Sequence, residues 1–316
     1  MYNCYTPRIA TRPLPSPSSQ ATSSSNEGRR RKTATASTTS GGEPSRVDDR
    51  AWNQLRPLFI DLGVVSQASG SAYLELEHTK VLVAVYGPKP RQDVEFSEDG
   101  KLLCDFRYAP FARRDGRLRQ RKERGGREGG GGGGPQEEER AASQLIAQAL
   151  EASVQLAKLP KSVIEIYVSV LQADGGEVGA AITCASLALA DAGIELFGLV
   201  ASSVVVATTT ASLPGDKKGG WNVHLDPTAT EEEGDGVREG EGGVLGLALM
   251  PTSGEVTQLW QSGRLDGTAM ERALEIATDG ALMVHAMMRK RLLKYMGDQE
   301  GGGGSSSSTS LFLSSS

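Results

Sequence analysis

Three groups of charged residues in this 316-residue chain have the types and spacing to do chemistry. Residues 113–128 hold eight Lys or Arg and three Asp or Glu, a local charge of +5, which suits contact with nucleic-acid phosphates without reading of the bases. Residues 231–241 hold six acids and one Arg, a local charge of −5, and carboxylates are common acid catalysts. Glu137–Glu139 open a predicted helix, where acids stabilise the positive end of the helix dipole.

Other common reaction chemistries have no motif in the sequence. It contains no P-loop, no G-x-G-x-x-G after a strand, no G-x-S-x-G and no H-E-x-x-H. No stretch approaches the ~20 consecutive apolar residues of a membrane-spanning helix, which argues against an integral membrane protein. The sequence therefore predicts no cofactor and no metal, since the cysteines and histidines are too scattered for a disulfide scaffold or a metal cluster: Cys4, Cys104, Cys184, His78, His224 and His285.

The composition of both ends predicts chain that does not fold. Residues 1–50 are mostly Ser, Thr, Pro, Gly and Arg, and residues 299–316 are mostly Gly and Ser, so both are expected to be disordered tails. Within the first tail, residues 28–32 form a weak basic cluster of the nuclear-import kind. An organelle transit peptide is the alternative, although no amphipathic apolar stripe accompanies the arginines.

The elements that must position the charged groups begin with strands. β-branched residues and alternation predict strands at 58–65, 72–77, 80–86 and 102–108. A helix from 137 to about 156 follows, because apolar residues recur at helical spacing until Pro160 stops it. A strand at 163–171, a tight Asp174-Gly175-Gly176 turn that needs positive φ, and an alanine-rich helix at 178–190 come next. That helix is expected to be buried and closely packed.

The second half repeats this order. Strands are expected at 197–208, 221–225, 244–250 and 255–261, followed by a long helix at 268–295. Four strands and a helix therefore occur twice, joined by a strand–helix unit, which predicts a duplicated α+β fold. We assign a first lobe to residues 51–193, with an Arg/Gly-rich loop at 113–136, and a second lobe to residues 194–298, with an acidic loop at 231–243.

Several segments resemble one known family when they are taken in order. They are Gly70–Glu75 with Thr79–Val81, Ala109–Phe111, Leu171–Gly176, Ala185–Ile194, and Leu249–Pro251 before Glu255–Leu259. Together, over about residues 53–295, they resemble the RNase PH family of phosphorolytic exoribonucleases, and within it the ring subunits of the eukaryotic RNA exosome. The resemblance implies a two-lobed fold of the ribosomal protein S5 domain 2-like type. It also implies a chemistry in which phosphate attacks the last phosphodiester bond of RNA.

The resemblance further implies where an active member keeps its catalytic groups, and this chain departs from that pattern. The Gly-Arg-x-Ser stretch of the phosphate pocket falls on residues 136–139, so that Glu138 stands in place of a cation. Like charges at ~4 Å repel by about 1 kcal/mol even in water. The carboxylate pair for acid catalysis or Mg²⁺ falls on Glu232 and Val244, and a valine cannot transfer a proton. Glu241 is a weaker alternative for the second acid.

The basic track implied by the resemblance is better kept. Arg113, Arg114 and Arg117 follow Ala109–Phe111, at the place where relatives contact the RNA backbone. We assign RNA contact to these three arginines, with a solvated insertion loop as the alternative interpretation.

The sequence therefore predicts a catalytically silent structural subunit of the exosome core ring. Such a subunit would support 3′–5′ RNA processing and degradation, including rRNA processing and mRNA turnover, in the nucleus, the nucleolus and the cytoplasm. The resemblance implies a homologous RNase PH-like subunit as the partner within a six-membered ring, together with RNA-binding cap subunits, hydrolytic nucleases and RNA. Two alternatives stay open: an active phosphate-dependent 3′–5′ exoribonuclease, and a small-molecule or organellar enzyme on the same fold.

Overall fold

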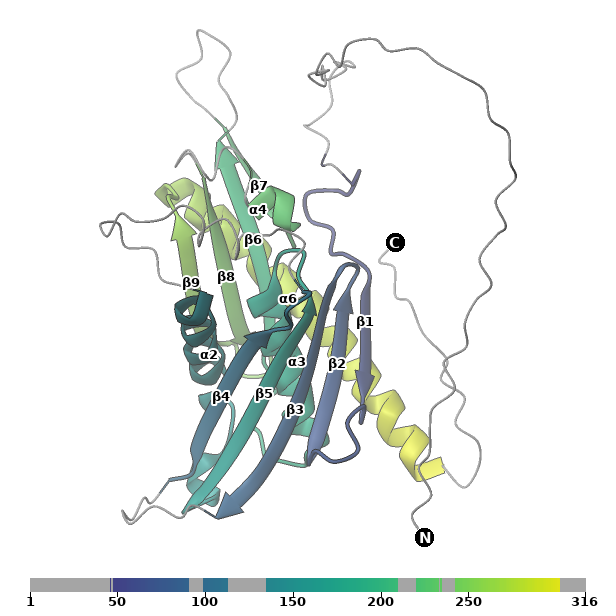
Figure 1. The fold of residues 1–316 in the computed structure, drawn as a ribbon. Coiled ribbons are helices and arrows are strands. Elements are labelled where there is room, and N and C mark those ends of the chain that lie inside the picture. Colours follow the sequence, from purple (N-terminus) through teal and green to yellow (C-terminus); the bar gives the residue numbers. More distant parts are fainter. Residues whose placement is uncertain are drawn as a thin grey trace, which may run out of the picture. The chain divides into compact units, whose positions relative to one another are not determined.

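The computed structural model describes residues 46, 48–90, 99–112, 135–209, 220–232, 234 and 242–301 (Figure 1). All of them belong to one compact unit, residues 45–316. The strands of this unit fall into two sheets, one formed from the first half of the chain and one from the second.

The first sheet has the strand order β1-β2-β3-β5-β4. Its pairs are antiparallel except for β4 and β5, which run parallel. Buried and partly exposed residues alternate along β3 and β5, as expected for strands with one face on a core. The first strand ends three residues earlier than predicted, because Gly63 turns the chain with φ +68°. The bounds are β1 Leu58–Leu62, β2 Gly70–Leu76, β3 Thr79–Pro90, β4 Lys101–Tyr108 and β5 Ser162–Gln172.

The second sheet is antiparallel throughout and has the order β7-β6-β8-β9. The predicted strand at 197–208 starts too early, because the chain bends at Phe197 and Gly198 before it pairs. The bounds are β6 Ala201–Thr209, β7 Trp221–Leu225, β8 Gly242–Met250 and β9 Glu255–Gly263.

The helices are α2 (Pro135–Glu151), α3 (Glu177–Asp191), the short α4 (Ala229–Glu232) and α6 (Gly267–Gly301). The predicted helix to residue 156 instead ends at Glu151, and Leu156–Lys158 form a separate 3₁₀ turn. The sequence did not predict α4. Within the described part of the chain, no helix combines the length and the apolar character needed to cross a bilayer.

The two sheets and the helices form alternating layers (Figure 1). Helix α3 packs between the sheets, against β2 and β3 on one side and β6 on the other, and α2 lies beside it against β4 and β9. Helix α6 covers the other face of the second sheet. Residues 179–189 of α3 are all buried, which confirms the prediction of a close-packed alanine-rich helix. Both sheets therefore share one continuous hydrophobic core.

Candidate functional site

The Asp174-Gly175-Gly176 turn connects β5 to α3 and forms one wall of the candidate site. Gly175 and Gly176 have φ of +85° and +68°, so the predicted positive-φ turn is confirmed. A Cβ atom on Gly175 would lie 2.6 Å from the carbonyl oxygen of Pro227. The turn therefore packs directly against the segment that follows β7.

Glu232 reaches this turn from α4. Its Oε1 atom accepts a hydrogen bond of 2.8 Å from the backbone N–H of Gly176. Burial, followed by the charge of the neighbouring Glu177, raises the pKa of Glu232 to about 8. The side chain is therefore mostly protonated at neutral pH. The described start of the predicted acidic loop is thus a short helix, α4, which turns the carboxyl group of Glu232 toward the start of α3.

Asp226 is held by a buried arginine rather than left for chemistry. The Nη2 atom of Arg56 lies 2.7 Å from Oδ1 of Asp226, while the backbone N and Nε donate to Oδ2 at 2.8 and 3.0 Å. Arg56 also donates to the carbonyl oxygens of Asp174 at 2.8 Å and Gly175 at 3.1 Å. Burial alone would raise the pKa of Asp226, but Arg56 outweighs it and holds the pKa below its ordinary value.

A second buried arginine neutralises the other acid of this region. Nε and Nη2 of Arg46 donate to the two carboxylate oxygens of Glu231, at 2.9 and 2.7 Å. Nη1 of the same guanidinium donates to the carbonyl oxygen of Leu225 at 2.8 Å. The segment that contains these arginines, residues 46 and 48–56, is called the strap below. The strap holds the end of β7 and the start of α4 in place. Asp226 and Glu231 therefore have a structural role, as partners of its arginines.

The position assigned to the second acid contains no carboxylate. Val244 pairs with Val206 on β6 and Ser262 on β9, and Val206 pairs with His224 on β7. Directly paired residues share a face, so the titratable group in this row is His224. Burial, followed by the charge of Arg46, lowers the pKa of His224 below 6.5. Val244 therefore cannot supply a proton, and a neutral imidazole stands two strands away.

The start of α2 is acidic and does not form a cationic pocket in the described residues. Glu137 and Glu138 are exposed in the first turn. Glu139 accepts a hydrogen bond of 3.3 Å from the backbone N–H of Tyr108. Ser143 accepts one of 2.9 Å from the N–H of Phe106, so this face of α2 covers the free edge of β4. The helix start thus repels phosphate and stabilises a strand edge.

Arg113, Arg114, Arg117 and Glu241 lie outside the described residues. The described residues contain no group of three or more His, Cys, Asp or Glu side chains placed to hold a metal ion. Glu232 and Glu177 alone do not fit the carboxylate site for Mg²⁺ that the family resemblance implies.

Sequence reasoning missed the three arginines of the strap, Arg46, Arg50 and Arg56. Arg46 and Arg50 lie within the predicted disordered tail, residues 1–50, yet both donate hydrogen bonds to the carbonyl oxygen of Asp226, so the predicted end of that tail is too late in the sequence. One local signal was available, because Arg56 follows Leu55 directly and precedes the apolar run of β1. An arginine placed in an apolar run is a candidate for a buried ion pair. Its acidic partner, however, lies 170 residues away and is not indicated by the local sequence.

Comparison with known proteins gives relatives over most of the chain. Residues 54–195 match the RNase_PH model, described as 3′ exoribonuclease family, domain 1. The exosome complex component Rrp41 of Methanopyrus kandleri is 36% identical over 256 residues, which cover 80% of this chain and 94% of the relative. The human exosome complex component MTR3 is 35% identical over 255 residues, covering 76% and 84% of the two chains.

A solved structure shows the same fold. The crystal structure of rice (Oryza sativa) Rrp46 aligns with a TM-score of 0.59 at 21% identity, covering 78% of this chain and all of the other. In the sequence, Asp226-Pro227 followed by Glu231–Gly234 resembles the ring-subunit type called mRNA transport regulator three, and MTR3 proteins are among the relatives found. The chain therefore belongs to the RNase PH family of 3′ exoribonucleases.

Proposed function

We propose that this chain is a structural subunit of the RNA exosome core ring and has no phosphorolytic activity of its own. The support for ring membership is its similarity to proteins named exosome complex components, over 76–80% of its length. In such a ring the chain would pair with a homologous RNase PH-like subunit and contact RNA-binding cap subunits and RNA.

One observation carries the proposed inactivity: Val244, to which the family resemblance assigns the second acid, lies in a row of paired residues that holds no carboxylate. Two acids of the segment after β7, Asp226 and Glu231, are already paired with arginines of the strap. The start of α2 adds negative rather than positive charge where phosphate would bind. Acid catalysis and phosphate binding act as a unit, so the loss of both is expected to abolish the reaction.

The test is phosphate-dependent release of nucleoside diphosphates from a single-stranded RNA by the purified chain. We expect none above a reaction without phosphate, while an active RNase PH enzyme in the same buffer gives a full signal. Diphosphate release by this chain that depends on phosphate would contradict the proposed inactivity and leave ring membership untouched.

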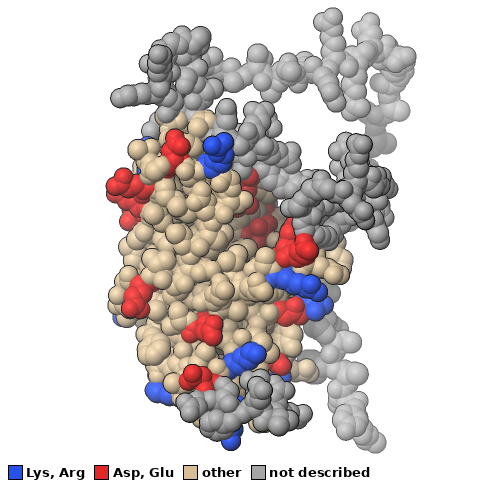
Figure 2. All heavy atoms as spheres, turned by 90° about the vertical axis from the view of Figure 1, so that its left-hand side faces the viewer, with Lys and Arg blue, Asp and Glu red and all other residues tan. Residues whose placement is uncertain are grey.

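The surface favours association with other chains. Figure 2 shows the side formed by β9, α2 and β4, where charged side chains are scattered over a broad uncharged area. Strands β4 and β9 expose Leu103, Val256 and Leu259 by 45%, 59% and 43%. Exposed apolar area of this kind promotes association. We expect the chain to self-associate when expressed alone and to form a stable heterodimer when co-expressed with a homologous ring subunit, measured by sedimentation. A monodisperse monomer that gains nothing from any such partner would contradict ring membership.

RNA contact by Arg113, Arg114 and Arg117 is proposed from the sequence alone. Each phosphate neutralised on a single strand adds about −0.7 to the slope of log affinity against log salt. Replacing the three arginines by alanine is expected to weaken binding of every RNA sequence by an assembled ring and to flatten that slope. An unchanged slope on a homopolymer RNA would favour the solvated-loop interpretation instead.

One observation favours a second function, that of an active phosphate-dependent exoribonuclease. The family resemblance assigns the first acid to Glu232, and the pKa of Glu232, raised to about 8, suits a proton donor near neutral pH. The diphosphate assay described above separates the two functions directly.

Roles in rRNA processing and mRNA turnover, and a nuclear, nucleolar and cytoplasmic location, follow from the ring proposal. Fluorescent tagging of the full chain at its C-terminus tests the location. Import into an organelle would instead support the transit-peptide interpretation of the N-terminus.

A further inference from the structure

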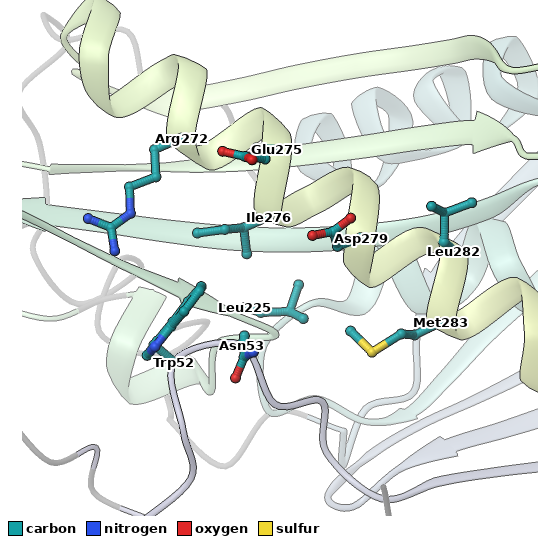
Figure 3. A pocket seen from close by; sticks show the side chains of 9 residues that line it. All are labelled: Trp52, Asn53, Leu225, Arg272, Glu275, Ile276, Asp279, Leu282 and Met283. Carbon is teal, nitrogen blue, oxygen red and sulfur yellow. The ribbon is translucent and has the colours of Figure 1, made fainter.

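A groove of about 550 Å³ runs along α6 on the outer face of the second lobe (Figure 3). One wall is α6, which contributes Arg272, Glu275, Asp279 and Met283, and the other is the strap at Trp52 and Asn53. Leu225 and Ile276 form a buried apolar floor. The volume falls within the range of ordinary ligand and peptide sites.

The walls of the groove are preformed. The carbonyl oxygen of Trp52 accepts a hydrogen bond of 2.8 Å from the N–H of Leu225, and the guanidinium of Arg272 lies 5.8 Å from the centre of the Trp52 ring. The buried bonds of Arg56 to Asp226 fix the strap just beyond the groove. A partner would therefore lose little binding free energy to ordering of this surface.

Large apolar side chains at the groove remain accessible. Trp52 is 37% exposed, Leu282 46% and Met283 38%. Leu282 and Met283 lie at the end of the α6 face that lines the groove, and Trp52 lies on the opposite wall. This face spans residues 272–283, about 16 Å at 1.5 Å per residue. That length and spacing match a short amphipathic helix laid into a groove, which is read by apolar anchors at i, i+3, i+4 and i+7.

The charge of the groove decides the kind of partner. Glu275 and Asp279 are both exposed, and neither forms an ion pair with another residue of the described ranges. The cation of the groove, Arg272, already stacks on Trp52. Two carboxylates against this one guanidinium give the lining a net charge of −1 (1 − 2), which repels the phosphates of RNA and attracts lysine or arginine.

We propose that the α6 groove binds a basic amphipathic helix of a partner protein, with apolar anchors over Leu225, Ile276 and Met283 and basic side chains against Glu275 and Asp279. This inference is independent of catalytic silence, because it concerns peptide binding at α6 and not phosphorolysis.

The test uses the full chain, co-expressed with a ring partner where solubility requires it, and two fluorescein-labelled helical peptides of about 12 residues. One peptide places leucine on one face and lysine on the other, and its twin replaces every lysine by glutamate. We expect fluorescence anisotropy to show binding of the lysine peptide and no binding of the glutamate peptide. Asp279→Lys should weaken it about tenfold and strengthen the glutamate peptide. The matched control Glu271→Lys changes the same charge on the same helix outside the groove and should change affinity by less than about twofold.

A second pair of variants tests the apolar anchors. Met283→Asp should weaken the lysine peptide about tenfold through loss of apolar contact, despite the added favourable charge, whereas Leu293→Asp, an exposed position on α6 outside the groove, should not. Equal effects of Asp279→Lys and Glu271→Lys, or equal binding of the two peptides, would overturn the proposal. Displacement of the peptide by a single-stranded homopolymer RNA would also overturn it, in favour of a nucleic-acid surface.

Discussion

The first turn of α2 and the segment from β7 to α4 both carry acids, yet the fold uses them in opposite ways. Glu137 and Glu138 stand exposed at a helix start, where they interact with the helix dipole and water. Asp226 and Glu231 are bound by the buried guanidinium groups of Arg56 and Arg46, and Glu232 closes on the backbone of Gly176. Identical residue types thus form a solvated surface in one region and a structural network in the other.

The difference shows that residue type alone does not decide whether a carboxylate is solvated or is part of a buried network. At α2 a change of charge leaves every buried group satisfied. In the network, removal of one partner leaves a buried charge unpaired, which costs far more than the pair contributes. The comparison therefore predicts large effects at the network and small ones at α2.

The largest effect is expected from Arg56→Ala. Removal of the guanidinium takes away the bidentate side-chain contact of Arg56 and leaves the buried carboxylate of Asp226 with the longer ion pair to Arg50 at 3.7 Å, and we expect the free energy of unfolding to fall by about 3 kcal/mol in urea titrations. Arg107→Ala, which removes an exposed arginine paired with Asp105, is the matched control and should leave the free energy of unfolding almost unchanged. Similar losses of unfolding free energy in the two variants would show that the burial of an ion pair does not determine its contribution to stability. Arg56→Lys, which keeps the charge but loses the forked contact, should fall between them.

Glu232→Gln should change how stability depends on pH. The folded-state pKa of Glu232, about 8, lies above its ordinary value of 4.5, so the folded state holds a proton that the unfolded state loses. This group therefore makes stability fall as the pH rises from about 4.5 to about 8. The variant should be more stable than the wild type at pH 8, and the difference should shrink toward pH 5.

Urea unfolding of variant and wild type across this pH range gives the difference between their free energies of unfolding. Groups that titrate equally in both proteins do not contribute to this difference. The lowered pKa values of His224 and His285 make stability fall as the pH falls through 6.5, the opposite direction, in both proteins. A constant difference between Glu232→Gln and wild type at every pH would contradict the buried, protonated carboxyl group.

A smaller effect is expected where α2 covers the edge of β4. Ser143→Ala removes the acceptor of the Phe106 N–H, and we expect a loss of about 1 kcal/mol with faster hydrogen exchange at that amide. Thr278→Ala on α6, which removes a hydroxyl bonded within its own helix, should alter neither quantity measurably. Unchanged exchange at Phe106 in the Ser143 variant would mean that water replaces the serine without cost.

The smallest effect is expected from Glu138→Arg. The side chain is exposed in the first turn of α2, so stability should change by less than about 1 kcal/mol. Phosphate-dependent shortening of RNA should remain absent, because the new cation does not supply the acid missing at Val244. Activity gained from this single change would show that the phosphate position alone had silenced the chain.

Local patterns in the sequence determined much of the fold. β-Branched residues and alternation predicted the strands, and an alanine-rich segment predicted the buried α3. Two consecutive glycines, Gly175 and Gly176, predicted a turn with positive φ. Each of these features depends on residues a few positions apart, and backbone sterics and periodicity act over that range. The family followed from the order of short segments, and Val244 and Glu138 were located by counting from them.

Only the tertiary structure decided which charges are buried and which face water. Arg56 and Asp226 are separated by 170 residues, and Arg46 and Glu231 by 185, so no local spacing pairs them. Counting from Asp226 located Glu232, but only the structure shows that α4 places its carboxyl group against the backbone of Gly176. The α6 groove likewise exists only because the strap lies beside the helix. The free energy of a charge depends on the dielectric and partners around it, and chain segments distant in sequence supply both.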